Sequence, residues 1–132
     1  MRILVVDDDA RLTELLQLVF ESRGFGVTVA HNGEQALASL EKELPEAILL
    51  DLMMPGMSGL EVLQAIRTCQ PELPVVLITG YAAIDNPVEA MKHGATDYLA
   101  KPFSNEEIVE KVKHALETRA VLIDEIYLHR EM

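Results

Sequence analysis

The sequence is poor in several features that would point to particular functions. It has a single cysteine, Cys69, which excludes an internal disulfide and fits a reducing compartment. Its 11 Lys and Arg residues are outnumbered by 22 Asp and Glu, and the resulting net charge of −11 argues against direct nucleic-acid binding by this chain. It contains neither a G-x-G-x-x-G nor a Walker A motif, which argues against dinucleotide and nucleoside-triphosphate binding.

Long hydrophobic runs are also missing. The longest apolar runs, such as Ile3–Val6 and Val75–Ile78, are far too short to span a bilayer. The first of them follows Met1 almost at once, which leaves no room for a signal peptide. With 132 residues, 49% of them hydrophobic and 25% charged, the chain is expected to be a globular cytoplasmic protein with one main domain.

Apolar runs of strand length alternate with amphipathic stretches five times. Strands are expected at Ile3–Val6, Val27–Ala30, Ala47–Leu50, Val75–Ile78 and Tyr98–Ala100. Helices are expected near Ala10–Arg23, Gly33–Glu43, Leu60–Thr68 and Pro87–His93, with a longer one from near Asn105. The apolar face of the first helix is expected to contain Leu12, Leu15, Leu16, Val19 and Phe20. Continuous apolar strands separated by helices predict an α/β domain with a parallel sheet covered on both faces.

Five polar residues stand at the carboxyl ends of these strands. Asp7 and Asp8 follow the first strand, and Asp51 follows the third. In the flavodoxin-like strand order 2-1-3-4-5 these two strands are neighbours at the switch point, where open parallel sheets bind ligands. Thr79 and Lys101 directly follow the fourth and fifth strands, so all five residues are expected at one edge of the sheet.

Aspartates gathered in this way need a counter-charge. At about 5 Å and an effective dielectric constant of about 20, each pair of carboxylates repels by about 3 kcal/mol. A raised pKa, Lys101 or a metal ion could relieve this repulsion. Oxygen ligands without His or Cys suit Mg²⁺, with Mn²⁺ as a possible substitute. A carboxylate beside such an ion can attack a phosphoryl group and form an acyl phosphate.

Four segments together resemble a known family. They are "ILVVDDD", "LLDLMMPGMSGLE", "VVLITGYA" and "AMKHGATDYLAKPF". From Arg2 to about Leu116 the chain resembles the receiver domain of two-component response regulators, and its third and fourth segments are similar to receivers of σ54-dependent, NtrC-like activators. The resemblance implies a CheY-like three-layer sandwich with a five-stranded parallel sheet and five helices.

The resemblance also implies a metal site and a phosphoacceptor. Asp51 would accept a phosphoryl group from a sensor histidine kinase. Asp7 and Asp8 would bind Mg²⁺ together with Asp51 and the backbone carbonyl of Met53. The chain would then catalyse only its own phosphorylation and dephosphorylation, and would not be an enzyme in the ordinary sense.

Further residues would form the switch. Lys101 would contact the phosphoryl group, and Thr79 would hydrogen-bond to it and move on activation. Tyr98 would turn inward, and the surface formed by the helix near Pro87–His93, the fifth strand and the last helix would change. The resemblance also implies a cis peptide bond between Lys101 and Pro102.

Other interpretations of these residues agree less well with the sequence. Asp9 is expected to cap the following helix, not to bind the metal. A Mg²⁺-dependent phosphohydrolase would need an acid/base two residues beyond Asp51, where Met53 stands, and a substrate cap that the sequence lacks. A pseudo-receiver that acts only as an interaction module is disfavoured by the intact set of Asp51, Thr79 and Lys101.

Residues 117–132 extend beyond the receiver pattern of residues 1–116. Their apolar stripe consists of Leu122, Ile123, Ile126 and Tyr127. This extension or linker is predicted either to dimerise or to pack back on its own domain; a homodimer would also use the helix near Pro87–His93 and the last helix. In NtrC-like relatives such a helix leads into an ATPase and a DNA-binding domain, so this chain is either a stand-alone receiver or an excised one.

Overall fold

The five predicted strands form one parallel sheet. A computed structural model of the protein describes residues 1–80 and 91–131, with side chains as far as Thr118. The strand order is β2-β1-β3-β4-β5, so the predicted α/β architecture and strand order are confirmed. The strands are β1 (Arg2–Val6), β2 (Gly26–Ala30), β3 (Ala47–Asp51), β4 (Val75–Gly80) and β5 (Asp97–Lys101).

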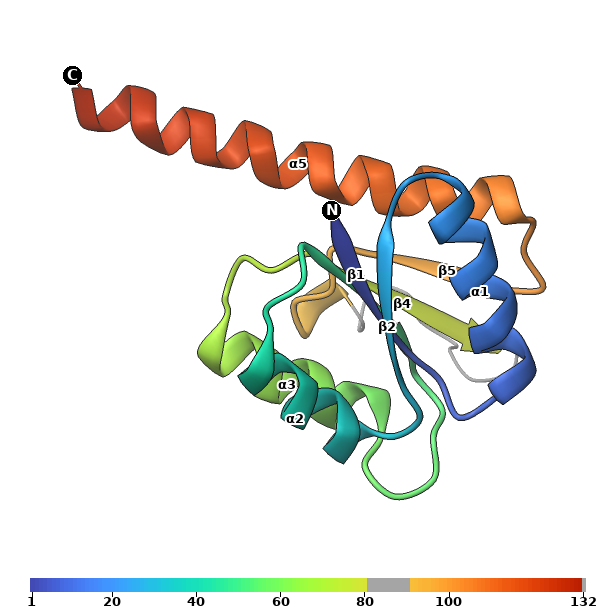
Figure 1. Cartoon of the computed structure of the whole chain (residues 1–132). Helices are drawn as coiled ribbons and strands as arrows, with labels where there is room; N and C mark the ends of the chain where they lie inside the picture. The colour runs from blue at the N-terminus through green and yellow to red at the C-terminus, as the bar shows by residue number, and fades with distance from the viewer. Residues whose placement is uncertain (81–90, 132) are drawn as a thin grey trace.

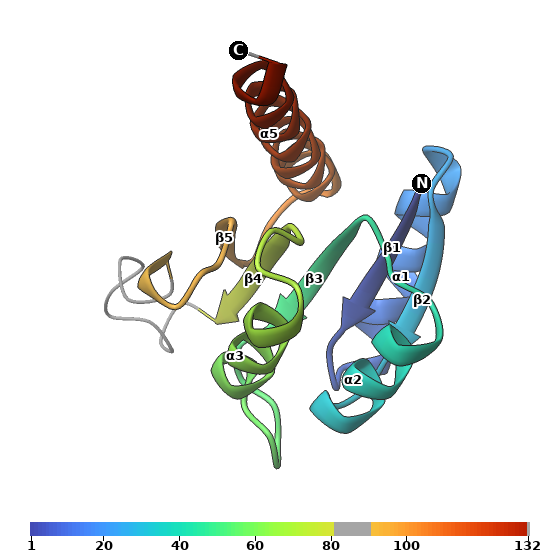
Figure 2. The same ribbon diagram turned by 90° about the vertical axis from the view of Figure 1, so that its left-hand side faces the viewer.

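Helices cover both faces of this sheet. They are α1 (Ala10–Ser22), α2 (Gly33–Lys42), α3 (Gly59–Cys69) and α5 (Asn105–Glu131). Helices α1 and α5 lie on one face, and α2 and α3 lie on the other (Figures 1 and 2). Most of the helix expected near Pro87–His93 lies outside the described residues. Met91 and Lys92 belong to the described part and are helical.

Alternate residues of the central strands supply two separate hydrophobic clusters. Ile3 and Val5 of β1 pack with α1 and α5, whereas Leu4 and Val6 of the same strand face α2 and α3. All four are at most 1% exposed. A parallel strand buried on both faces has no polar side, which explains its continuous apolar sequence.

The predicted apolar face of α1 is wrong at one position. Leu16, Val19 and Phe20 are buried and Leu12 is partly buried, but Leu15 is 46% exposed. At 3.6 residues per turn, Leu15 lies about 100° from the centre of the buried arc.

The last helix is longer than the sheet beneath it. The apolar stripe of its first part packs on the sheet, with Ile108, Val112 and Ala115 at most 1% exposed. Helix α5 then continues past the body of the domain as one uninterrupted helix (Figure 1). The four apolar side chains predicted to extend the stripe, from Leu122 to Tyr127, lie outside the described residues. None of the helices within residues 1–80 and 91–131 combines the length and the apolar character needed to cross a membrane.

Two helix starts hold the loops at the carboxyl edge of the sheet. Asp9 caps α1, and its carboxylate accepts hydrogen bonds from the backbone N–H groups of Arg11 at 3.0 Å and Leu12 at 3.3 Å. The expected capping role of Asp9 is thereby confirmed. Helix α3 begins with a capping box formed by Ser58 and Glu61.

The first residue of α3 lies against the end of β3. The N–H of Gly59 donates a 2.9 Å hydrogen bond to the carbonyl of Leu52. A Cβ atom at Gly59 would overlap the backbone carbonyl oxygen of Asp51 and the Cα atom of Leu52. Because these are backbone atoms, they cannot move away as a flexible side chain would, so the small size of glycine allows this approach.

We therefore expect Gly59→Ala to destabilise the protein by about 2 kcal/mol, as overpacking of a tight contact does. Urea denaturation followed by far-UV circular dichroism measures the change. The matched control is Gly26→Ala, where the added methyl group meets only the end of the flexible Arg2 side chain. Equal midpoints for Gly59→Ala and the wild type would contradict the proposed tight approach.

Candidate functional site

The sheet register brings the predicted acidic residues together. Val6 of β1 pairs with Leu50 of β3, so the following residues, Asp7 and Asp51, leave neighbouring strands at the same edge. Asp51 in turn pairs with Ile78 of β4, one residue before Thr79. The prediction that these residues gather at one edge of the sheet is confirmed.

Three carboxylates meet at this edge. Asp7, Asp8 and Asp51 each offer one oxygen atom, and these three atoms lie within 4.8 Å of one another. Asp7 is fully buried and Asp51 is 3% exposed, whereas Asp8 is exposed to solvent. The group can therefore hold a metal ion that is reached from solvent on the side of Asp8.

Lys101, at the end of β5, supplies a positive charge to this cluster. Its Nζ atom lies 3.2 Å from Oδ2 of Asp7 and 3.8 Å from Oδ2 of Asp51. Lys101 is the last residue of β5 and is followed by a cis bond to Pro102, as predicted. Thr79 is 3% exposed near the end of β4, the strand between β3 and β5.

The two buried carboxylates are held in the same way. Oδ1 of Asp7 accepts a hydrogen bond from the backbone N–H of Asp9 at 2.9 Å, and Oδ1 of Asp51 accepts one from the N–H of Met53 at 3.2 Å. In both residues the second oxygen, Oδ2, points to Lys101. The backbone thus fixes the orientation of each carboxylate, and the lysine ties the two together.

The charge on Asp51 is not fully compensated by these contacts. Burial and then the neighbouring Asp7 carboxylate raise the pKa of Asp51 to about 7, although Lys101 and the N–H of Met53 act in the opposite direction. One ammonium group against three ionised carboxylates leaves a charge of about −2. A divalent cation with a preference for oxygen ligands, such as Mg²⁺, matches both this charge and this donor set.

A match to a protein family accounts for this arrangement. Residues 3–113 match the model of the response regulator receiver domain. The chain belongs to this family. A receiver domain is a module of two-component signalling and not a conventional enzyme.

Curated relatives of this receiver are regulatory proteins. The uncharacterized transcriptional regulatory protein YkoG of Bacillus subtilis is 37% identical over 124 residues, which cover 94% of this chain and 54% of YkoG. The DNA-binding response regulator MtrA of Mycobacterium leprae is 41% identical over 115 residues, which cover 87% of this chain and 51% of MtrA. The chain therefore spans about half the length of these relatives.

Solved structures show the same fold. NtrX from Brucella abortus superposes with a TM-score of 0.91 at 32% identity, covering 96% of this chain and 29% of NtrX. A receiver domain protein from Clostridium thermocellum superposes with a TM-score of 0.86 at 28% identity, covering 92% of this chain and 98% of that one. The predicted similarity to NtrC-like receivers is thus confirmed, and the sequence relatives include OmpR-family regulators as well.

The structure also adds a residue that the sequence interpretation of this receiver did not connect with the site. Nδ1 of His31 lies 3.3 Å from the backbone carbonyl oxygen of Asp7. His31 directly follows β2, which borders β1, so its position at the carboxyl end of a strand could have placed it there. The imidazole ring contacts the backbone of Asp7 and has no oxygen atom to offer to a metal ion.

The raised pKa of Asp51 predicts how stability changes with pH without divalent metal. In the unfolded chain an aspartate loses its proton near pH 4, whereas in the folded protein Asp51 keeps it up to about pH 7. The folded state binds more protons in this window, so its stability falls as the pH rises through it and levels off above it.

The Asp51→Asn variant cannot ionise at this position. Its free energy of unfolding should therefore rise relative to that of the wild type as the pH increases from about 4 to about 7. Urea denaturation of both proteins in EDTA, at pH 5, 6, 7 and 8, measures this difference. The gain should amount to a few kcal/mol, because Asp51 is buried. A constant difference across this range would show that the carboxyl group titrates normally.

Proposed function

We propose that this receiver accepts a phosphoryl group on Asp51 from a sensor histidine kinase, in a Mg²⁺-dependent reaction, and acts as a signalling switch. The observation that carries this proposal is the cluster of Asp7, Asp8 and Asp51, whose carboxylate oxygens lie within 4.8 Å of one another beside Lys101. The family match supports the same assignment.

In the proposed reaction Asp51 is the nucleophile. A carboxylate oxygen of Asp51 attacks the phosphorus atom of a phosphohistidine, an acyl-phosphate P–O bond forms, and the P–N bond to the histidine breaks. Mg²⁺ would be held by Asp7, Asp8, Asp51 and the backbone carbonyl of Met53, and when bound it would supply positive charge to offset that on the phosphoryl oxygens. Lys101 lies 3.8 Å from Asp51 and is placed to contact another phosphoryl oxygen.

Asp51 must be ionised to attack. Its raised pKa means that the metal-free site still holds a proton for part of the time near neutral pH. A cation among the three carboxylates favours the ionised form, so metal binding and activation of the nucleophile are coupled. The acceptor becomes reactive only where charge compensation is complete.

Phosphorylation adds a charge of about −2 and three acceptor oxygens at the edge of the sheet. We assign Thr79 to bind one of these oxygens through its hydroxyl, since it is buried on the neighbouring strand. Tyr98 lies on the edge strand β5 and is partly buried. We assign its ring to turn inward as Thr79 moves. The change would reach the surface of β5 and α5 and the helix expected near Pro87–His93.

The response to phosphorylation is proposed to depend on this surface and on residues 117–132. We propose a receiver unit of residues 1–116 and a helical extension of residues 117–132, with homodimerisation through the extension and the surface of α5. The matched residues make up only about half of the curated relatives, which therefore contain further residues that could supply an output. The exposed thiol of Cys69 fits the cytoplasm, where histidine kinases transfer their phosphoryl groups.

Incubation with Mg²⁺ and acetyl phosphate tests the acceptor. Intact mass spectrometry should show a gain of one phosphoryl group that hydroxylamine removes, because acyl phosphates react with this nucleophile. Asp51→Asn should show no gain. The matched control is Asp9→Asn, which removes a neighbouring charge outside the metal cluster but keeps a good capping residue, and should be modified like the wild type.

Light scattering in the presence of beryllofluoride would show whether modification changes the oligomeric state. A wild-type protein that binds Mg²⁺ but gains no phosphoryl group, and does not respond to beryllofluoride, would refute the switch. It would leave a constitutive interaction module as the remaining interpretation.

The metal site makes a separate prediction. Asp8→Asn should weaken Mg²⁺ binding about 10-fold or more, because a carboxylate ligand with its charge is lost. Isothermal titration calorimetry with Mg²⁺, and with Mn²⁺ in parallel, measures the affinity. Asp9→Asn is again the control, and equal losses for both variants would show that the effect is only one of overall charge.

A further inference from the structure

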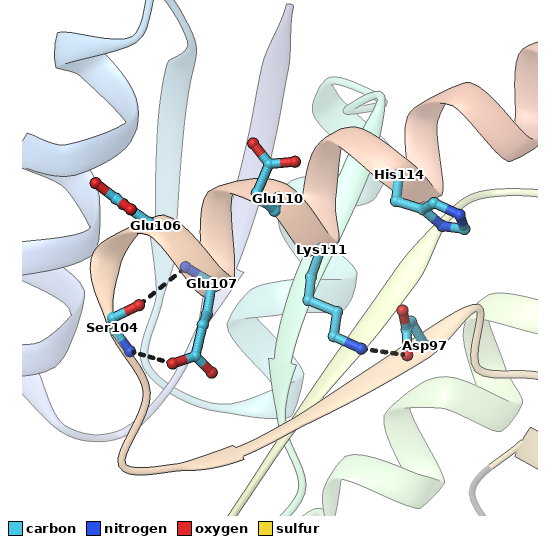
Figure 3. Close-up of a pocket in the computed structure, with 7 residues that line it drawn as sticks. All are labelled: Asp97, Ser104, Glu106, Glu107, Glu110, Lys111 and His114. Atoms are coloured by element: carbon cyan, nitrogen blue, oxygen red, sulfur yellow. Dashed lines mark hydrogen bonds and ion pairs between the residues drawn. The ribbon is translucent and has the colours of Figure 1, made fainter.

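Three residues join the edge strand to the last helix. Nζ of Lys111 on α5 lies 3.3 Å from Oδ1 of Asp97 on β5, and Figure 3 shows this lysine side chain reaching down from the helix to the strand. The same Oδ1 atom accepts a 2.8 Å hydrogen bond from the backbone N–H of Tyr98. Lys111 also lies over the Tyr98 ring, with Nζ 5.9 Å from the ring centroid.

This contact crosses from one face of the sheet to the other. The Tyr98 ring packs against the hydrophobic cluster of α2 and α3, whereas α5 belongs to the cluster on the opposite face. Only at the edge of a sheet can a side chain from one face reach a residue of the other face, and β5 is the edge strand. Asp97 holds the ammonium group at this edge, where it meets the face of the ring.

We propose that Lys111 is a positioning residue that holds the Tyr98 ring at the edge of the sheet and so favours the resting state of the switch. The inference rests on the function proposed above, in which the ring turns inward on phosphorylation. An ammonium group is attracted to an aromatic face, and the attraction is lost when the ring moves away from it. The inward turn of Tyr98 therefore breaks the contact with Lys111.

Loss of the contact should shift the switch toward its active state. Removing a cation–π contact at a partly exposed site changes an equilibrium by about two- to fivefold. Lys111→Met keeps the aliphatic length of the side chain but removes its charge. We expect this variant to bind beryllofluoride, in the presence of Mg²⁺, about two- to fivefold more tightly than the wild type.

The affinity is measured by NMR titration of protein with ¹³C-labelled tyrosine rings. The Tyr98 signals are assigned with Tyr98→Phe, and in Lys111→Met they should shift in the resting protein toward their beryllofluoride-bound positions. Lys111→Arg should restore both the wild-type signals and the wild-type affinity, because a guanidinium group also binds an aromatic face. The matched control is Lys113→Met, which removes the same charge from an exposed position on the same helix and should leave the Tyr98 signals unchanged.

A double-mutant cycle separates the ring contact from other effects of the charge. In a Tyr98→Leu background, Lys111→Met should no longer change the affinity for beryllofluoride. Equal effects of Lys111→Met with and without the ring, or equal effects of Lys111→Met and Lys113→Met, would overturn the proposal. A wild type that does not bind beryllofluoride would overturn the proposed function. The contact with Lys111 would then still be tested by comparing the Tyr98 signals of the resting wild type with those of Lys111→Met and Lys113→Met.

Discussion

Repulsion among carboxylates in a confined space is the constraint on which this structure depends. Two of the three acids are buried, where water cannot screen their charges. Neighbouring groups reduce the energetic cost of burying these charges. A backbone N–H orients each buried carboxylate, and one lysine pairs with both. Because the compensation stops short of neutrality, the site is suited to a cation and, under the function proposed above, to the oxygens of a phosphoryl group beside it. A neutral cluster would be more stable alone but would have no affinity for either.

The parallel sheet makes this concentration of charge possible. Each strand is apolar along its length and polar only where it ends, so hydrophobic burial on both faces supports the edge at which charge collects. Helix starts complete the frame. Asp9 caps α1 beside the acids, and Gly59 lets the start of α3 approach the backbone that carries Asp51. The apolar residues of each strand thus contribute to stability, whereas the polar residues at the carboxyl ends form the site.

The strand order 2-1-3-4-5 came from the flavodoxin-like pattern that the chain resembles, since no local pattern determines which strands are neighbours. Periodicity and turn residues predicted the strands themselves, the polar residues at their carboxyl ends and the cap at Asp9. These features depend on local patterns that repeat at each strand. The exposure of Leu15 was not predictable in this way, because apolar residues spaced by three and four do not show how far around α1 the buried arc extends. The contacts of His31 with Asp7 and of Lys111 with Tyr98 join residues far apart in the chain. Such contacts depend on side-chain directions that a linear pattern does not contain.

The uninterrupted course of α5 has a mechanical consequence. Its 27 residues form a rod about 40 Å long, whose base packs on the sheet next to β5 and whose far end lies beyond the body of the domain. A helix is stiff over this length, so a tilt of about 5° at its base would displace its tip by about 3.5 Å. A small rearrangement beside Asp97 would therefore produce a larger displacement at the far end of α5. Any segment joined to that end would change its position accordingly.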